Sequence, residues 1–104
     1  MTYTLAKYSV KPEKLKEVKK ALREFIAAMK VQEPRTFYLV LRENSTPTFY
    51  HLMSFEDEAA ERKHAQSKHV ERFVKKIYPE CLTKPTFAEL KTFAATKGQW
   101  IVER

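Results

Sequence analysis

The three histidines of this sequence, His51, His64 and His69, are its clearest candidates for acid–base chemistry near neutral pH. An imidazole with an unperturbed pKa of about 6.5 can accept a proton and return it after a small environmental shift. His64 shares a stripe with Ala59 and Ala60 in a predicted helix, because residues three and four apart lie on one helical face. The spacing predicts an inward-facing imidazole, so His64 is our candidate catalytic residue. A core histidine hydrogen-bonded to the sheet is the alternative interpretation.

The other two histidines lie in different settings. His51 belongs to a predicted strand and shares a face with Met53 and Phe55, so we expect these residues to face a pocket or a subunit interface. His69 lies in the first turn of a predicted helix, where we expect a surface or capping residue. No carboxylate or cysteine pairs with the histidines at the spacing of metal ligands, so we predict no metal site.

Tyrosines in the predicted strands could offer hydroxyl groups to an aromatic ligand. Together with the strand residues above, the candidate substrate-binding residues are His51, Tyr8, Tyr38, Met53 and Phe55. Tyr50 offers the same chemistry from a neighbouring position. The alternative interpretation is sheet packing, which is the commoner role of a tyrosine in a strand.

Alternation and helical periodicity predict the elements that must position these side chains. The predicted strands are Tyr3 to Val10, Thr36 to Arg42, Thr48 to Phe55 and Thr86 to Ala94. An apolar stripe of a long amphipathic helix comprises Leu15, Val18, Leu22, Phe25, Ile26 and Met29. That helix is expected to begin near Pro12 and to end by Glu33, because the residue before Pro34 is disfavoured in helical angles.

Two shorter helices are predicted between the third and fourth strands. Ser54 is the expected N-cap of the first, and acidic residues follow it where the helix dipole favours negative charge. Ser67 is the expected N-cap of the second, and Pro79 is expected to end it. The resulting order of strand, helix, strand, strand, helix pair and strand predicts an α+β fold. The arrangement is a ferredoxin-like split βαβ, with an antiparallel sheet and helices on one face.

The strand Thr36 to Arg42 has two apolar faces. Phe37, Leu39 and Leu41 point one way, whereas Tyr38 and Val40 point the other. A single layer of helices covers only one face of a sheet, so something else must cover the second. We therefore expect a homodimer that packs through the sheet face.

Composition limits the class of protein. The 104 residues predict one domain over 1–104, with a core at about 3–93 and a C-terminal arm at about 97–104 that packs on the body or on a partner. A hydrophobic fraction of 43% suffices for a core, and the net charge of +7 is interpreted as a solvated surface. Cys81, the single cysteine, is interpreted as inert. With no secretory signal pattern and no membrane-spanning apolar run, we expect a cytoplasmic location and no membrane partner.

The chain resembles the antibiotic biosynthesis monooxygenase family, small dimeric α/β-barrel proteins that include cofactor-free quinol and anthrone oxygenases. The residues that carry the resemblance are the Glu33-Pro34 pair, Phe49, Phe55, Ala59, His64, Ser67, His69 and Phe73. The resemblance implies a homodimer packed sheet to sheet and a pocket between sheet and helices. It also implies oxidation of an electron-rich aromatic by molecular oxygen, with no metal or flavin cofactor.

Departures from the family pattern keep other functions open. Arg35 stands where many members have glycine, and Met53 stands where many have glutamate. The haem-ligand histidine of a haem-degrading branch would fall near Val74, so that activity is disfavoured. The primary hypothesis is a cofactor-independent monooxygenase of a quinol- or anthrone-like substrate. The alternatives are a non-catalytic dimeric ligand-binding or stress-related domain and, less favoured because the third strand lacks the basic and glycine residues of RNA readers, an RNA-binding domain.

Overall fold

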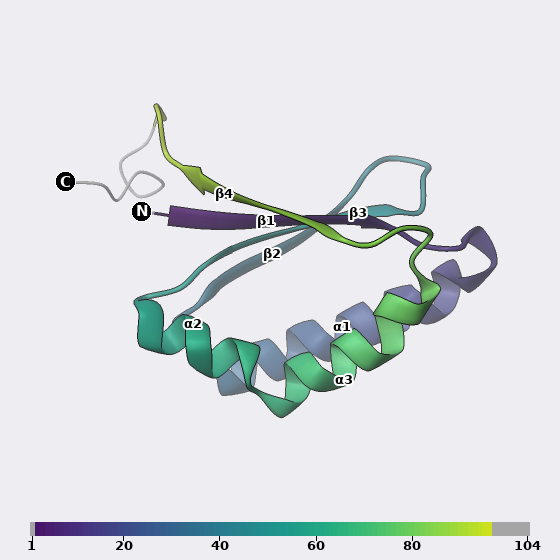
Figure 1. Cartoon of the computed structure of the whole chain (residues 1–104), viewed down its shortest axis with the longest axis horizontal. Helices are drawn as coiled ribbons and strands as arrows, with labels where there is room; N and C mark the ends of the chain where they lie inside the picture. Colours follow the sequence, from purple (N-terminus) through teal and green to yellow (C-terminus); the bar gives the residue numbers. More distant parts are fainter. Residues whose placement is uncertain (1, 97–104) are drawn as a thin grey trace.

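The computed structural model describes residues 2–96, and within them the elements follow the predicted order (Figure 1). The strands are β1 Thr2–Ser9, β2 Phe37–Arg42, β3 Thr48–Ser54 and β4 Thr86–Lys91. The helices are α1 Leu15–Gln32, α2 Glu58–Ala65 and α3 Lys68–Ile77, with 3-10 turns at Pro12–Lys14 and Tyr78–Glu80. The proposed C-terminal arm at 97–104 lies outside the described residues. None of the helices within residues 2–96 is long and apolar enough to cross a membrane.

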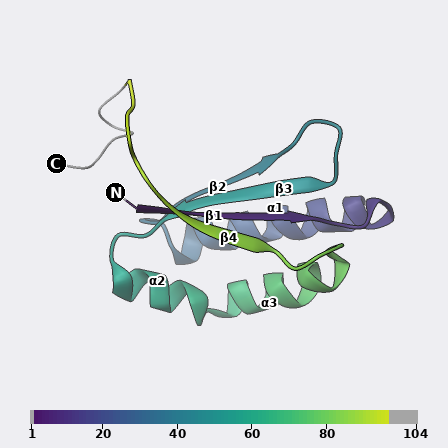
Figure 2. The same cartoon turned by 45° about the horizontal axis from the view of Figure 1, so that its top comes forward.

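The four strands form one antiparallel sheet in the order β2-β3-β1-β4. β2 and β3 form the predicted hairpin, in which Val40 is paired with His51. All three α-helices lie on one side of this sheet, as two views of the chain show (Figures 1 and 2). The predicted ferredoxin-like α+β fold is therefore confirmed, although β4 ends at Lys91 rather than at Ala94.

The core lies between the inner face of the sheet and helices α1 and α3. Its buried residues are Tyr8, Val10, Val18, Ala21, Leu22, Phe49 and Ile77. The alternation of β1 places Ala6 and Tyr8 on the inner face, and Val10 follows just beyond the strand; all three are buried. By contrast, α2 contains no fully buried residue.

The outer face of the sheet remains largely apolar. Leu39 and Leu41 of β2 are 40% and 48% exposed, and Leu90 of β4 is 42% exposed. The strand register places Leu5 and Leu52 between them on the same face. No helix among residues 2–96 covers this side, which agrees with the two apolar faces seen in the sequence of β2 (Figure 2).

The predicted N-cap of α2 is wrong. Ser54 is the last residue of β3, and its hydroxyl donates to the carbonyl oxygen of Thr2 at 2.8 Å. Asp57 caps the helix instead, because its carboxylate accepts the backbone N–H of Ala60 at 2.8 Å. The chain needs the intervening residues to pass from the sheet to the helical layer. The second predicted cap is correct, since Ser67 accepts from the N–H of Val70.

Replacing Ile77 tests how much burial in the core contributes to the free energy of unfolding. Its side chain is 0% exposed at the end of α3, so Ile77→Ala should lower the free energy of unfolding by about 2–5 kcal/mol through lost burial and a cavity. Val31→Ala, on a residue that is 74% exposed, should change it by less than about 0.5 kcal/mol. Urea denaturation followed by circular dichroism measures both, and equal effects would contradict the described packing.

Candidate active site

A cavity of about 270 Å³ lies between the inner face of the sheet and the helices. The sheet contributes Thr4, Ala6, Tyr8, Tyr38, His51, Met53 and Phe87 to its wall. The helices contribute Phe25, Glu61, His64, Ala65, Val70, Phe73 and Val74. Phe55, Tyr78 and Pro85 complete the lining. This is a mostly apolar space with a few polar groups, the usual composition of a site for a small organic ligand.

A chain of hydrogen bonds crosses the sheet wall of the cavity. The hydroxyl of Tyr8 lies 2.8 Å from Nε2 of His51, and the hydroxyl of Tyr38 lies 2.7 Å from Nδ1 of the same ring. His51 is only 2% exposed. Its burial, with a smaller contribution from the charge of His64, lowers the pKa of His51 to about 4. His51 is therefore neutral at pH 7.

The neutral state of His51 determines how many protons the Tyr8–His51–Tyr38 chain of hydrogen bonds carries. A neutral imidazole has one N–H and one lone pair, so one tyrosine hydroxyl accepts from the ring and the other donates to it. Burial raises the pKa of both Tyr8 and Tyr38, which keeps their hydroxyls protonated. The two hydroxyls and the neutral ring carry three protons, and two of these are used in the hydrogen bonds between them. One hydroxyl proton therefore remains for a hydrogen bond to a ligand oxygen. The Tyr8–His51–Tyr38 chain of hydrogen bonds can thus donate a hydrogen bond to a ligand but is poorly suited to act as a base.

A buried carboxylate joins the other two histidines. Oε2 of Glu33 lies 2.7 Å from Nδ1 of His64 and 2.5 Å from Nε2 of His69. The Glu33 side chain is 8% exposed, and its other oxygen accepts from the hydroxyl of Thr36 at 3.3 Å. A carboxylate only accepts, so both imidazoles must donate an N–H to it. In a neutral His64 the lone pair then lies on Nε2, which has no hydrogen-bond partner among residues 2–96.

The end of α1 and the junction between α2 and α3 bring this cluster together. Glu33 is the C-cap residue of α1, where its backbone N–H donates to the carbonyl of Met29 at 2.8 Å. Ser67 orders the α2–α3 junction, because its hydroxyl donates to the carbonyl of His64 at 2.7 Å and also caps α3. His69 therefore enters the first turn of α3 facing Glu33. The end of α1 and the α2–α3 junction lie on the same side of the sheet (Figure 1).

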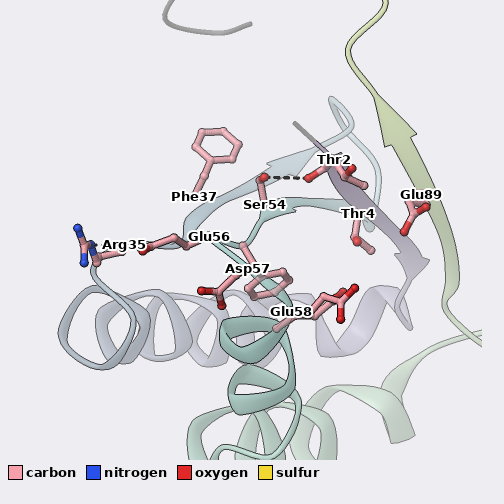
Figure 3. Close-up of a pocket in the computed structure, with 11 residues that line it drawn as sticks. Thr2, Thr4, Arg35, Phe37, Ser54, Glu56, Asp57, Glu58 and Glu89 are labelled. Carbon is pink, nitrogen blue, oxygen red and sulfur yellow. Dashed lines mark hydrogen bonds and ion pairs between the residues drawn. The ribbon is translucent and has the colours of Figure 1, made fainter. Parts of the chain in front are cut away.

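A larger, polar hollow of about 710 Å³ adjoins the cavity (Figure 3). The two spaces share Thr4, Phe55 and Glu61 in their walls. The acidic residues of the hollow are Glu56, Asp57, Glu58, Glu61 and Glu89. Arg35 pairs with Glu56 at 3.2 Å on one side, and Glu89 comes from β4 on the other (Figure 3). The acidic residues make this hollow negatively charged, so it disfavours anionic ligands relative to neutral ones.

Comparison with known proteins decides the family. A family model described as Antibiotic biosynthesis monooxygenase matches residues 1–76. The chain belongs to the antibiotic biosynthesis monooxygenase family. No curated protein matches the sequence significantly.

Solved structures share the fold of this family member. A crystal structure of an antibiotic biosynthesis monooxygenase is 24% identical, with 90% of this chain and 100% of that chain covered and a TM-score of 0.81. A conserved protein from Methanosarcina mazei is 22% identical, with coverages of 86% and 89% and a TM-score of 0.75. A protein from Pseudomonas aeruginosa is 18% identical, with coverages of 89% and 94% and a TM-score of 0.72.

The sequence-predicted site residues of this antibiotic biosynthesis monooxygenase homologue gather in one place. All six of them, His64, His51, Tyr8, Tyr38, Met53 and Phe55, line the cavity. Tyr50 does not, because the strand register places it on the outer face, where its hydroxyl donates to Glu43 at 2.9 Å. Cys81 lies outside the cavity wall, and burial raises the pKa of its thiol.

Two interpretations from the sequence need correction. His69 is not a surface residue, since it is only 7% exposed and donates to Glu33. The expectation that no carboxylate pairs with the histidines is also wrong, because Glu33 pairs with two of them across 31 and 36 residues. Sequence spacing carries no signal for such a distant pairing. The family resemblance of the Glu33-Pro34 pair was the one available hint.

His51 predicts a pH dependence of stability. The folded chain holds its pKa at about 4, below the ordinary 6.5, so between these values the unfolded chain binds a proton that the folded chain does not. Stability should therefore fall as the pH is lowered from 6.5 to 4, by up to about 3 kcal/mol from this residue. His51→Gln should show a smaller loss over the same interval in urea titrations. Identical losses in both proteins would contradict a buried neutral His51.

Proposed function

We propose that this protein is a cofactor-independent monooxygenase that oxidises a small, neutral, electron-rich aromatic substrate of the quinol or anthrone type with molecular oxygen. The observation that carries the proposal is the hydrogen bond from His64 to the buried carboxylate of Glu33 at the wall of the cavity. Family membership supports the reaction class.

His64 has the arrangement of a general base. Glu33 accepts the Nδ1 proton, so it selects the tautomer with its lone pair on Nε2 and orients the ring. The carboxylate also stabilises the imidazolium that forms when Nε2 takes a proton. The positive charge that His64 gains is then balanced by the carboxylate of Glu33, which lowers the free-energy cost of removing a proton from the substrate.

The reaction needs the substrate as its own electron donor. His64 removes a proton from an anthrone-type methylene, and the carbanion passes one electron to dioxygen. The substrate radical and superoxide combine to a peroxide, which takes the proton back from the imidazolium. Loss of water then leaves a carbonyl, so that R₂CH₂ and O₂ give R₂C=O and H₂O. The protein contributes the base, a dry cavity and orientation.

The opposite wall of the cavity is suited to hold the substrate. The Tyr8–His51–Tyr38 chain has one hydroxyl proton to donate to a substrate oxygen. On the helical wall, Phe25 and Phe73 pack on each other with ring centroids 4.7 Å apart and supply flat apolar surface. A volume of about 270 Å³ suits a substrate of one to a few fused rings.

We further propose a homodimer that buries the outer face of the sheet. Leu5, Leu39, Leu41, Leu52 and Leu90 form an apolar surface there that no helix of residues 2–96 covers. Contact with a second copy would remove this surface from water, which is the usual role of a patch of this kind.

A binding protein without turnover is the competing function. The polar groups of the cavity bond mainly to one another, and Met53 occupies the sheet wall in place of a carboxylate. A site of this kind could hold an aromatic ligand and leave it unchanged.

Oxygen consumption distinguishes the two functions. The purified protein should accelerate oxygen uptake above the uncatalysed rate for at least one member of a panel of hydroquinones and anthrones. His64→Gln should lower kcat by about 10²–10⁴-fold, because the general base is lost. Glu33→Gln should lower it by about tenfold or more, since the amide cannot stabilise an imidazolium.

The matched control is Glu43→Gln. This variant loses the same charge on the exposed hairpin, where the Glu43 carboxylate accepts a hydrogen bond from Tyr50, so its kcat should equal that of the wild type. No uptake across the panel, or uptake that His64→Gln leaves unchanged, would overturn the proposed catalytic role.

The dimer has a separate test. Leu41→Lys places a charge in the proposed interface and should shift the sedimentation coefficient toward that of a monomer. Val31→Lys, on the exposed side of α1, should leave the association unchanged. A wild-type protein that sediments as a monomer at all concentrations would contradict the proposed interface.

A further inference from the structure

We infer that Glu33, His64 and His69 form a binding site for one divalent transition-metal ion of the zinc type, whose occupancy removes His64 from acid–base use. The first half of this inference is independent of the oxygenase activity, and the second half rests on the proposed function. The observation is the convergence of three potential ligand atoms, one carboxylate oxygen and two imidazole nitrogens, within 4.8 Å of one another.

The donor set fits a borderline transition-metal ion. Two histidines and one carboxylate form the protein part of many zinc sites that keep a fourth position open. Calcium and magnesium prefer oxygen ligands throughout, whereas monovalent copper prefers sulfur. The cluster therefore favours Zn²⁺, Co²⁺, Ni²⁺ or Fe²⁺ over the abundant hard cations.

The distances need only a small adjustment. Oε2 of Glu33 lies 2.7 Å from Nδ1 of His64 and 2.5 Å from Nε2 of His69. Zinc binds such atoms at about 2.0–2.2 Å, which separates neighbouring ligand atoms by roughly 3 Å. The two imidazoles would move slightly outward from the carboxylate as the ion enters. Both rings already present the relevant nitrogen to Glu33.

The surroundings hold the ligands in place and leave a route to them. The hydroxyl of Thr36 donates to the other oxygen of Glu33, and such outer contacts orient a ligating carboxylate. A separate cavity of about 370 Å³ includes Glu33, Ser67 and His69 in its lining, so it reaches two of the three ligands. The cations of its rim, Lys63, Lys68 and Arg72, are all exposed, so water screens their repulsion of a metal ion.

Metal binding changes the tautomer of His64. The ion takes the lone pair of Nδ1, where the ring holds its proton in the metal-free chain. The proton of the neutral imidazole then lies on Nε2. That nitrogen becomes a hydrogen-bond donor and loses the ability to accept a proton from a substrate. A bound ion would thus inhibit the base reversibly, and a chelator would restore it.

Calorimetric titration of the full, metal-free chain with ZnCl₂ tests the site. The wild type should bind one Zn²⁺ per chain, and Co²⁺ should give visible absorption bands with the same stoichiometry. Glu33→Gln should weaken binding by more than the roughly 10–100-fold that loss of an outer-shell contact costs. The matched control Glu43→Gln removes an exposed carboxylate of equal charge and should bind like the wild type.

A measurement on the wild type avoids any folding defect of a variant. In ¹⁵N-detected histidine NMR spectra, Zn²⁺ should move the ring signals of His64 and His69 and convert His64 to the Nε2–H tautomer. The signals of His51, which bonds to two tyrosines, should stay in place. No one-to-one binding at micromolar Zn²⁺, unchanged binding in Glu33→Gln, or ring signals that do not respond would each overturn the site.

The two halves fail separately. Zinc binding without oxygen uptake for any substrate would keep the metal site and refute the oxygenase. Oxygen uptake that saturating Zn²⁺ leaves unchanged would refute the inhibition and keep the oxygenase.

Discussion

The buried carboxylate of Glu33 is the interaction on which the arrangement of the helical layer depends. It joins the end of α1 to the α2–α3 junction through His64 and His69, which lie 31 and 36 residues further along the chain. A carboxylate at the negative end of a helix dipole and away from water is costly unless donors surround it. The two imidazoles and the hydroxyl of Thr36 supply those donors. Through His64, the cluster also forms part of the helical wall of the cavity.

Two histidines of the same cavity acquire opposite roles from their neighbours. His51 is hydrogen-bonded to two tyrosine hydroxyls, and its burial keeps it neutral within a chain of hydrogen bonds that can donate one more to a ligand. Nδ1 of His64 donates to a carboxylate, which leaves the lone pair of the neutral ring on Nε2. One wall of the cavity is thus suited to hold an oxygen atom, and the other to exchange a proton. Residue type alone does not separate these roles, since both side chains are imidazoles.

The sequence predicted those features that local physical rules determine. Alternation in β2 separated Tyr38 from the leucines of the outer face, and the helical stripe of α1 placed Phe25 on the buried side, because burial selects one face of each element. The N-cap of α2 was misplaced, since Ser54 and Asp57 are both good caps and only the length of β3 decides between them. The hydrogen bond between Glu33 and His69 could not be predicted, because it depends on how the end of α1 meets the start of α3, two segments that are distant in the sequence.

The absence of any buried residue in α2 gives this helix a distinct place in the energetics of the protein. Segments that bury little apolar surface open at a lower free-energy cost than the rest of a fold. α2 carries His64 and Ala65 in the cavity wall, and His64 joins it to the rest of the fold through Glu33 and through its ring contact with Phe55. We therefore expect α2 to open at a lower free-energy cost than the sheet or α1, which would widen the cavity for a bulky molecule. The kinetics of ligand exchange would then report on the contacts that His64 makes with Glu33 and with the neighbouring aromatic rings.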